Sequence, residues 1–471
     1  MILEDSIQAF LEADIPASFE QFASHLDVEW VETALVDSGT ATVRRRRIPS
    51  QHVVWLVIGM ALFRDRSIQE VVSHLHLVLP RYKKTGKEKK VTQAYAPSAI
   101  PQARYRVGAA PLEMLFAQTA LRWSTAAADQ DRWRGLALYG VDGTTLRIPD
   151  TEINRETFGL PGTGRGQSGY PQVRLVALMA LRSHLMAATA FGPYGGKKTG
   201  ECTLAKELWP QVPERSLLIV DRNFLDYGLL FGLSHNYSTG EVDGDKHWLI
   251  RTKKNTRWKT VKVLGDGDEL VELKLSRQAR LKDPELPKTM VVRAVRYQVR
   301  GYQPQTLLTS LVDATQYPAL DFARLYHERW EIELGYDEVK THMLERQEAL
   351  RSKKPEGVRQ EIWGILLAYN LVRKEMLEVA EAAKVPPIRI SFRHALQLIR
   401  VFCLIEAWNM APGNIPKRLA GMKEMMQLLI LPQRRSDRRY RRHVKIKMSG
   451  YKRNPGRPAQ KTAESKEKEP K

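Results

Sequence analysis

The N-terminal part of the chain spaces its apolar residues as helices do. An apolar run over 51–64 has the length and period of a buried helix. Ser67 and Glu70 have the spacing of a capping box, which predicts a second helix from there to about residue 78. A third, short helix is expected over 98–108, with Gly108 near its end. This region is therefore predicted to be mostly helical.

After residue 131 the apolar positions form short runs between turn residues, a pattern typical of strands. Two of these runs lead directly into an aspartate. Asp142 is followed by Gly143 and Thr144, which predict a turn, and Asp221 follows the last run. The expected order is strand, strand, strand, helix, strand, with strands at 136–141, 173–181, 185–191 and 216–220 and the helix at 203–208.

The next segment, about 236–312, again alternates short β-prone runs with turn signals and predicts an inserted β subdomain. A long helix is then expected from Asp321 past Lys340. The expected strands of the insertion are 247–251, 260–264, 269–275, 290–299 and 306–311, and the expected later helices are 358–373, 375–383 and 392–408.

These patterns divide the 471 residues into four regions. A chain of this length has room for two or three domains with at least one sizeable core. The regions are a mostly helical one (1–130), a strand-rich one that includes the insertion (131–372), a second helical one (373–432) and a basic tail (433–471).

Charge is the strongest feature of the composition. The formal net charge is +21, and a chain this basic usually meets a polyanion, most often nucleic acid. Basic runs at 44–47 and 81–90 contribute, the second as an expected charged loop, and the tail holds 15 Lys/Arg against 4 Asp/Glu after residue 433. The tail has too few apolar residues for a core and is expected to be disordered. A ribosome-like or membrane-surface protein would also be basic, so charge alone leaves the partner open.

Cysteine content and apolar runs narrow the class further. Cys202 and Cys403 lie too far apart in sequence to indicate a disulfide framework or a zinc cluster, which fits a reducing cytoplasm. The first ten residues lack the basic segment of a secretory signal. The longest apolar runs, 53–63 and 362–372, are too short to span a bilayer. We therefore expect a cytoplasmic protein without a membrane partner.

Three carboxylates, Asp142, Asp221 and Glu333, carry the candidate chemistry. Glu333 lies on the expected long helix, where offsets of 3, 7 and 14 from Tyr326 fall on one face, while Glu331 points elsewhere. That face therefore presents a phenol, a guanidinium, a carboxylate and an ammonium together: Tyr326, Arg329, Glu333 and Lys340.

Such a set suits phosphodiester chemistry. Two divalent cations roughly 3.5–4 Å apart activate a water and stabilise the leaving oxygen of an in-line displacement. Holding them takes about three carboxylates, because Mg²⁺ keeps several waters and substrate oxygens. The cations on the helix face suit phosphates.

Each part also has a simpler interpretation. An Asp-Gly pair such as Asp142-Gly143 is usually a turn, and Asp221 can be a helix N-cap. The stripe of charges on the helix can be a solvated face whose ion pairs contribute a few tenths of a kcal/mol each. The joint occurrence of all three carboxylates, on the expected elements in the expected order, favours the catalytic interpretation.

The motif Tyr326-x2-Arg329-x3-Glu333-x6-Lys340 resembles the YREK signature of the insertion sequence 4 transposase family. Asp142 in Val-Asp-Gly and Asp221 in Val-Asp-Arg-Asn-Phe are similar to the first and second catalytic aspartates of that family. The resemblance covers roughly residues 10–435, including 350–356. At Asn223 the family more often has glycine or alanine, so the local turn is expected to differ.

This resemblance implies a ribonuclease-H-like, retroviral-integrase-like α+β catalytic core with helical regions on either side. It implies that Asp142, Asp221 and Glu333 bind two Mg²⁺, for which Mn²⁺ can substitute. The family pattern also implies DNA contacts near the cleaved end by five residues: Tyr326, Arg329, Trp330, Lys340 and Arg251.

The resemblance implies a DNA transposase that binds the terminal inverted repeats of an insertion sequence, cuts the strand and joins it to target DNA. Two alternatives stay open: a related nuclease or resolvase that does not join strands, and an inactive DNA-binding derivative. Two ends must be processed together, so a homodimer is expected, with the helices of 392–430, in the region 373–432, as its interface. The basic region 1–130 is expected to bind DNA, the region 131–372 is expected to be the catalytic domain, and the protein is expected on the nucleoid.

Overall fold

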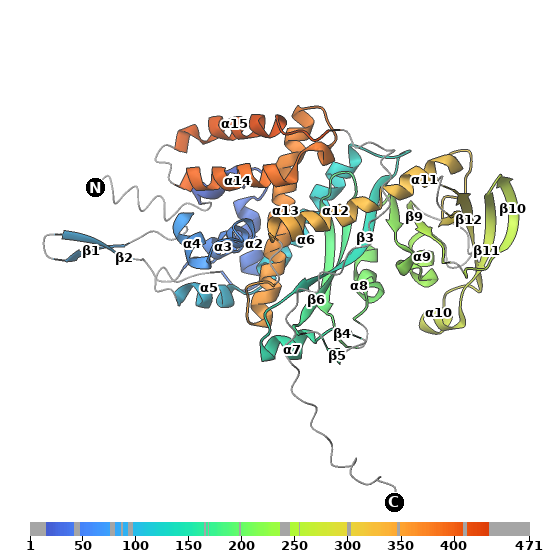
Figure 1. Ribbon diagram of the computed structural model, residues 1–471, viewed down its shortest axis with the longest axis horizontal. Helices are drawn as coiled ribbons and strands as arrows, with labels where there is room; N and C mark the ends of the chain where they lie inside the picture. The colour runs from blue at the N-terminus through green and yellow to red at the C-terminus, as the bar shows by residue number, and fades with distance from the viewer. Residues whose placement is uncertain are drawn as a thin grey trace, which may run out of the picture.

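The computed structural model describes residues 16–41, 48–75, 81–85, 88–92, 98–163, 166–167, 169–196, 199–235, 245–253, 255–298, 303–345, 349–407 and 412–432. The predictions for the basic run 44–47 and for the tail after residue 433 lie outside the described residues. Figure 1 shows a helical half, which contains the N-terminal helices, beside a half built on a large twisted sheet.

The N-terminal region is helical, as predicted. The capping box at Ser67 and Glu70 is present, and Gly108 ends a helix with a positive φ of 69° that favours glycine. The expected charged loop at 81–90 is wrong, because its backbone pairs as the antiparallel hairpin β1–β2. In the register, Tyr82 is the partner of Val91 and Arg81 of Thr92, so the β-prone residues of the two runs lie on paired positions among the lysines. The elements are η1 (Ala17–Phe22), α2 (Val28–Asp37), α3 (Ser50–Leu62), α4 (Ile68–His74), β1 (Arg81–Thr85), β2 (Glu88–Thr92), α5 (Ala99–Val107) and α6 (Ala110–Asp129).

One nine-stranded sheet forms the other half, in the order β10-β11-β12-β13-β9-β8-β3-β6-β7. β3, β8 and β9 are parallel, and β6 runs antiparallel to β3. The five strands from β7 to β9 form the ribonuclease-H-like unit. The strands are β3 (Ala137–Arg147), β6 (Gln172–Ala180), β7 (Met186–Pro193), β8 (Ser216–Val220), β9 (Lys246–Arg251), β10 (Lys259–Gly265), β11 (Asp268–Lys274), β12 (Thr289–Tyr297) and β13 (Gln305–Thr309).

The boundary of the β insertion differs from the prediction. The run at 247–251 was expected inside the insertion, but β9 pairs parallel to β8 and belongs to the central sheet. The insertion therefore starts after Arg251, and its last strand β13 pairs with β9, so that both parts share one sheet. A short β-prone run looks alike in either place, because strand pairing is decided by contacts distant in sequence.

The first strand also differs from the prediction. The turn expected at Gly143 is wrong: β3 continues to Arg147, and Asp142 pairs with Ala177 of β6 in the middle of the strand. Paired on one side by β6, this second half of β3 keeps its extended backbone despite the Asp-Gly sequence. The expected order of strand, strand, strand, helix, strand is confirmed, with two-residue β4 (Gly162–Thr163) and β5 (Gly166–Gln167) and helix α7 (Glu152–Phe158) inserted after β3.

Helices cover both faces of the sheet. α8 (Glu201–Leu208) and α9 (Tyr227–Ser234) pack on one face around a core that contains Tyr139 and Val141 of β3. On the other face, Leu138 and Leu146 of β3 join a larger core that also includes residues of the N-terminal and C-terminal helices. Short elements complete these layers: η2 (Trp209–Gln211), η3 (Arg222–Phe224) and α10 (Arg277–Lys282).

The expected long helix after residue 321 is interrupted. It forms α11 (Ala319–His327), a tight turn and α12 (Trp330–Asp337), and ends in the π-helical turn η4 (Glu338–Met343). In the turn, the amides of Glu328 and Arg329 donate to carbonyls three residues back. The backbone keeps helical dihedrals there, so the segment continues in one direction (Figure 1).

The two helices expected at 358–373 and 375–383 are one helix, α13 (Pro355–Ala382). Nothing between residues 373 and 375 breaks a helix, and both parts bury their apolar faces. α13 crosses residue 372, where a domain boundary was expected. The remaining helices are η5 (Pro387–Arg389), α14 (Phe392–Ala407), η6 (Pro412–Asn414) and α15 (Ile415–Gln427).

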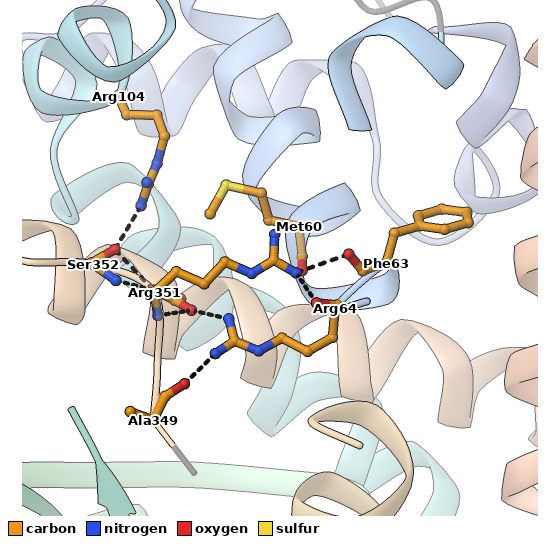
Figure 2. Close-up of polar contacts among 8 residues, drawn as sticks. Met60, Phe63, Arg64, Arg104, Ala349, Arg351 and Ser352 are labelled. Carbon is orange, nitrogen blue, oxygen red and sulfur yellow. Dashed lines mark hydrogen bonds and ion pairs between the residues drawn. The ribbon is translucent and has the colours of Figure 1, made fainter. Parts of the chain in front are cut away.

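A buried polar network joins the N-terminal helices to the start of α13 (Figure 2). Glu361 of α13 accepts from the Arg64 guanidinium at 2.6 Å and from the backbone amide of Ser352 at 3.0 Å. The Arg351 guanidinium donates to carbonyls at the end of α3, including that of Phe63 at 2.9 Å, and Arg104 donates to the Ser352 hydroxyl at 3.1 Å. Because these charges are paired and largely buried, the helical half is fixed to the segment that follows η4.

Candidate active site

Three of the predicted site residues lie in one row across the sheet. Val141, Val220 and Ile250 are register partners on the parallel strands β3, β8 and β9. The next residues along are Asp142, Asp221 and Arg251, so these three lie at the same level on adjacent strands. Neighbouring strands are about 4.8 Å apart, which places the two aspartates side by side.

α12 brings the third carboxylate to this row. Arg329 donates from Nη2 to Glu333 Oε1 at 2.9 Å, and its Nη1 lies 3.8 Å from Asp142 Oδ2. Asp221 also acts electrostatically on the Arg329 guanidinium. Among the described residues, the three carboxylates do not form a group whose ligand oxygens all lie within 4.8 Å of one another. Arg329 instead forms ion pairs with Asp142 and Glu333, and Asp221 acts on it electrostatically.

The other predicted residues of the helix face the same strands. Tyr326 is 8% exposed, and its hydroxyl donates to the carbonyl of Val220 at 3.3 Å. Lys340, in η4, donates to the Thr144 hydroxyl at 3.0 Å. Trp330 is 39% exposed and lies under the Arg329 guanidinium, 5.2 Å from ring centre to Cζ. Tyr326, Arg329 and Lys340 therefore contact β8 and β3 despite the break and the π turn, and Glu333 is held beside them by Arg329.

Tyr336 is a further residue of this site that sequence reasoning missed. Its buried hydroxyl donates to the carbonyl of Asp142 at 2.6 Å and accepts from the amide of Ala177 at 3.1 Å. It thus ties α12 to β3 and β6 at the level of the aspartate. Its position three residues after Glu333, on nearly the same helix face, was the available signal.

The carboxyl group of Asp142 is held in an unfavourable setting for its charge. Burial raises its pKa to about 6, and the nearby Glu333 and Glu201 carboxylates add to this, against the lowering effects of the Gly143 amide and Arg329. Its Oδ1 accepts from the Gly143 amide at 2.8 Å. A cation at this position would reverse the effect, because a positive charge favours the ionised carboxylate.

The opposite side of the helical segment uses its acidic residues differently. Arg182 donates two hydrogen bonds of 2.9 Å to Glu328, and His184 Nε2 lies 2.9 Å from Glu331, so the prediction that Glu331 points elsewhere is confirmed. Glu338 pairs with Arg373. Burial would raise the pKa of Glu338, but Arg373 and His184 outweigh it and lower the pKa to about 2.

The three carboxylates of this site fit a hard divalent cation. Asp142, Asp221 and Glu333 offer only carboxylate oxygens, the ligands that Mg²⁺ and Mn²⁺ prefer. The Asp142 and Glu333 side chains are 21% and 38% exposed, so metal ions and DNA can reach them.

A second group with metal-ligand residues lies elsewhere in the chain. His25 Nε2 lies 3.0 Å from Glu375 Oε1 and 3.6 Å from Glu378 Oε1. Lys423 of α15 already forms ion pairs with both glutamates. This group therefore contains a cation of its own and joins the N-terminal region to α13 and α15.

An acidic site at the edge of a ribonuclease-H-like sheet, with one carboxylate on a packed helix, defines a DDE enzyme. Residues 16–117 match the family described as "Insertion element 4 transposase N-terminal", and residues 135–371 match "Transposase DDE domain". The chain is 38% identical over 422 residues to "Transposase InsG for insertion sequence element IS4" of Escherichia coli (strain K12), covering 89% of this chain and 90% of that protein. The chain belongs to the insertion sequence 4 family of DDE transposases.

Among solved structures, the chain is similar to a piggyBac transposase synaptic complex with hairpin DNA. The TM-score is 0.42 at 11% sequence identity, covering 89% of this chain and 86% of that one.

Family membership settles the general activity. The protein is a transposase, an enzyme that cuts and joins phosphodiester bonds of DNA and depends on a divalent metal ion. In the part of the chain that the structure describes, no helix has the length and apolar character needed to cross a bilayer.

Proposed function

We propose that Asp142, Asp221 and Glu333 together hold two Mg²⁺ ions and cut and rejoin DNA strands at the ends of a mobile element. The observation that supports this most is the sharing of one guanidinium, Arg329, by carboxylates from β3, β8 and α12. Two aspartates on neighbouring parallel strands and one glutamate above them supply the three carboxylates that such a site needs.

When bound, the ions would activate the attacking oxygen and stabilise the leaving oxygen of an in-line displacement. The residues of the chain supply the rest. The Gly143 amide and the Tyr336 hydroxyl fix the orientation of Asp142, and Arg329 holds Glu333 toward the strands. The reaction would first release a 3′ hydroxyl at the element end, which then attacks a phosphodiester of the target.

Contacts to DNA would come from the rim of this site. Lys340 of the motif and the neighbouring Trp330 are exposed, and they offer an ammonium for phosphate and a ring for an unpaired base. Arg251 lies at the end of the carboxylate row and can meet the strand that the aspartates hold. The buried Tyr326 holds α11 against β8 through its hydrogen bond to the Val220 carbonyl. It would reach DNA once that hydrogen bond breaks.

The remaining regions would serve end recognition and pairing. We propose that the N-terminal helices contact the terminal inverted repeats and that two copies process two ends together, with α14 and α15 at their interface. The exposed apolar residues Val401, Ile405 and Met425 on those helices support this assignment.

A strand-transfer assay tests the proposal. The substrate is duplex DNA from the sequence that flanks the gene, either intact or pre-cut at the 3′ end, with Mg²⁺ and a target plasmid. We expect cleavage of the intact end and joining of the pre-cut end, both lost in Asp142→Asn and Glu333→Gln. Cleavage without joining would favour a nuclease, and full activity in either variant would contradict the assignment.

A further inference from the structure

A fourth carboxylate, that of Glu201, lies beside Asp142. Glu201 is the first residue of α8, which packs against β3, β6 and β7 on the face opposite α12. Its side chain reaches β3 at Gly143. A Cβ built on Gly143 would lie 2.6 Å from both Cγ and Cδ of Glu201 and 2.8 Å from its Oε1. Side-chain atoms at these distances would overlap, so the carboxylate occupies the space that any other residue at 143 would fill.

The sheet is open at this level. β8 ends at Val220, opposite Val141, so the second half of β3 pairs only with β6. Asp142 and Gly143 are therefore the first residues of β3 without a partner on the β8 side. A side chain that lies against the backbone of Gly143 from the α8 face is next to the Asp142 peptide, at the point where the pairing of β3 with β8 has ended.

Glu201 acts electrostatically on both sides of this opening. Burial raises the pKa of Asp142 and that of Tyr336, whose hydroxyl donates to the Asp142 carbonyl from the α12 face, and Glu201 adds to both shifts. Within the described residues, no ion pair or hydrogen bond of the Glu201 side chain offsets its charge. A half-buried carboxylate close to the carboxyl group of Asp142 is costly unless a cation joins them.

A purely structural role explains less. A carboxylate that only began α8 would gain from the helix N-terminus wherever it pointed, with no need of glycine opposite it. The pairing of Gly143 with Glu201 instead lets the acid lie against the backbone next to Asp142, whose carboxyl group it affects electrostatically.

We propose that Glu201 is a fourth carboxylate of the catalytic centre, which reaches it past the side-chain-free position at Gly143 and helps to hold the divalent cation at Asp142. This inference rests on the proposed function, since it assumes the cation site at Asp142. In this arrangement the Gly143 amide donates a hydrogen bond to Asp142, and the absence of a side chain at Gly143 leaves room for Glu201.

Calorimetric titration of the full-length, DNA-free protein with Mn²⁺ tests this without relying on activity. Glu201→Gln keeps the shape and removes the charge, and we expect its Mn²⁺ affinity to fall about 10–100-fold, as for other residues that support a metal site. The matched control is Glu207→Gln, an exposed glutamate on the same helix, which should bind like wild type.

A second variant tests whether the missing side chain at Gly143 is what admits Glu201. In Gly143→Ala the new methyl group should push the flexible Glu201 side chain away, with an equal loss of Mn²⁺ affinity. Because both changes remove one interaction, the double variant should lose no more than either single one. Circular dichroism melts establish that each variant is folded. Wild-type Mn²⁺ affinity in folded Gly143→Ala would show that Glu201 does not depend on the missing side chain at Gly143.

Asp142→Asn separates this inference from the proposed function. If Asp142→Asn loses Mn²⁺ binding and Glu201→Gln binds like wild type, Glu201 has no part in the site and this inference is wrong. If Asp142→Asn also binds like wild type, the proposed function itself fails.

Discussion

The two sides of the helical segment α11–α12–η4 both carry acidic residues and arginines, but they pair them differently. On the side away from the sheet edge, Glu328 and Glu338 each meet an arginine, Arg182 and Arg373. On the side facing β3 and β8, Arg329 is shared by Asp142, Asp221 and Glu333. The first side balances its charges within the protein, whereas the second leaves carboxylates in excess.

This difference separates structural from chemical glutamates. A buried carboxylate with its own arginine has a lowered pKa, as Glu338 has, and stabilises the fold. For Asp142, burial outweighs the Gly143 amide and the Arg329 guanidinium and raises the pKa to about 6, so this carboxylate gains from an external cation. Removing the charge of a glutamate should therefore lower the stability of the fold on the side of Glu338 and the rate of catalysis on the side of Glu333.

The largest effect is expected at Glu333. Glu333→Gln should lower the rate of strand cleavage at least roughly a thousandfold, because metal-ion stabilisation supplies several kcal/mol and each 1.36 kcal/mol is a factor of ten. The free energy of unfolding should change by less than about 1 kcal/mol, since the Glu333 side chain is 38% exposed and Arg329 keeps Asp142 as a partner. Gel assays of cleavage and urea melts measure the two effects. Asp337→Asn, an exposed acid on the same helix, is the control and should cleave normally.

The opposite outcome is expected at Glu338. Glu338→Gln leaves the Arg373 guanidinium, 1% exposed, without its partner and should lower the free energy of unfolding by roughly 3–5 kcal/mol. The cleavage rate per folded molecule at low temperature should stay within a few-fold of wild type. A Glu338→Gln protein as stable as wild type would remove the distinction between the two sides.

The same glutamate predicts a pH dependence of stability. Its pKa falls from 4.5 to about 2 on folding, so its contribution is complete above pH 4.5 and is lost as the pH falls toward 2. The difference in unfolding free energy between wild type and Glu338→Gln should be constant from pH 7 to 5 and shrink below 4.5. Urea titrations at a series of pH values measure this difference, and a gap that does not narrow in acid would show that Glu338 is not the group involved.

Smaller effects are expected at the rim. Trp330→Ala should weaken binding of a pre-cut DNA end by about 1–3 kcal/mol if the ring stacks on a base. Leu334→Ala is the matched control, because Leu334 is 38% exposed on the same helix against 39% for Trp330. Fluorescence anisotropy measures both, and equal losses in the two variants would contradict a stacking role.

The smallest effect concerns salt. Lys340→Met should reduce the slope of log affinity against log salt concentration by about 1, because a single phosphate contact is lost. The loss should be similar for different DNA sequences. An unchanged slope would mean that the Lys340 ammonium stays with Thr144 when DNA binds.

Local signals predicted the parts of the fold that depend on local chemistry. The capping box at Ser67, the helix end at Gly108 and the strand 216–220 follow from short sequence patterns, and the structure has them. The turn at Gly143 was wrong because strand pairing with β6 overrides the local preference of an Asp-Gly pair.

The candidate site divides in the same way. Helical spacing placed Arg329 and Glu333 on one face, which a single helix determines. The contacts of Tyr336 with β3 and of Glu201 with Gly143 depend on which strand lies opposite which helix. No spacing along the chain encodes that relation, so these residues emerge only from the folded structure.

The most direct test of the account is the number of Mn²⁺ ions bound per chain when an element end is present. Electron paramagnetic resonance of the full-length protein with pre-cut end DNA counts the bound ions. Two ions per chain are expected for wild type, with fewer in Asp142→Asn and Glu333→Gln and two in Asp337→Asn. Two ions in Asp142→Asn or Glu333→Gln would show that these carboxylates do not hold the metal.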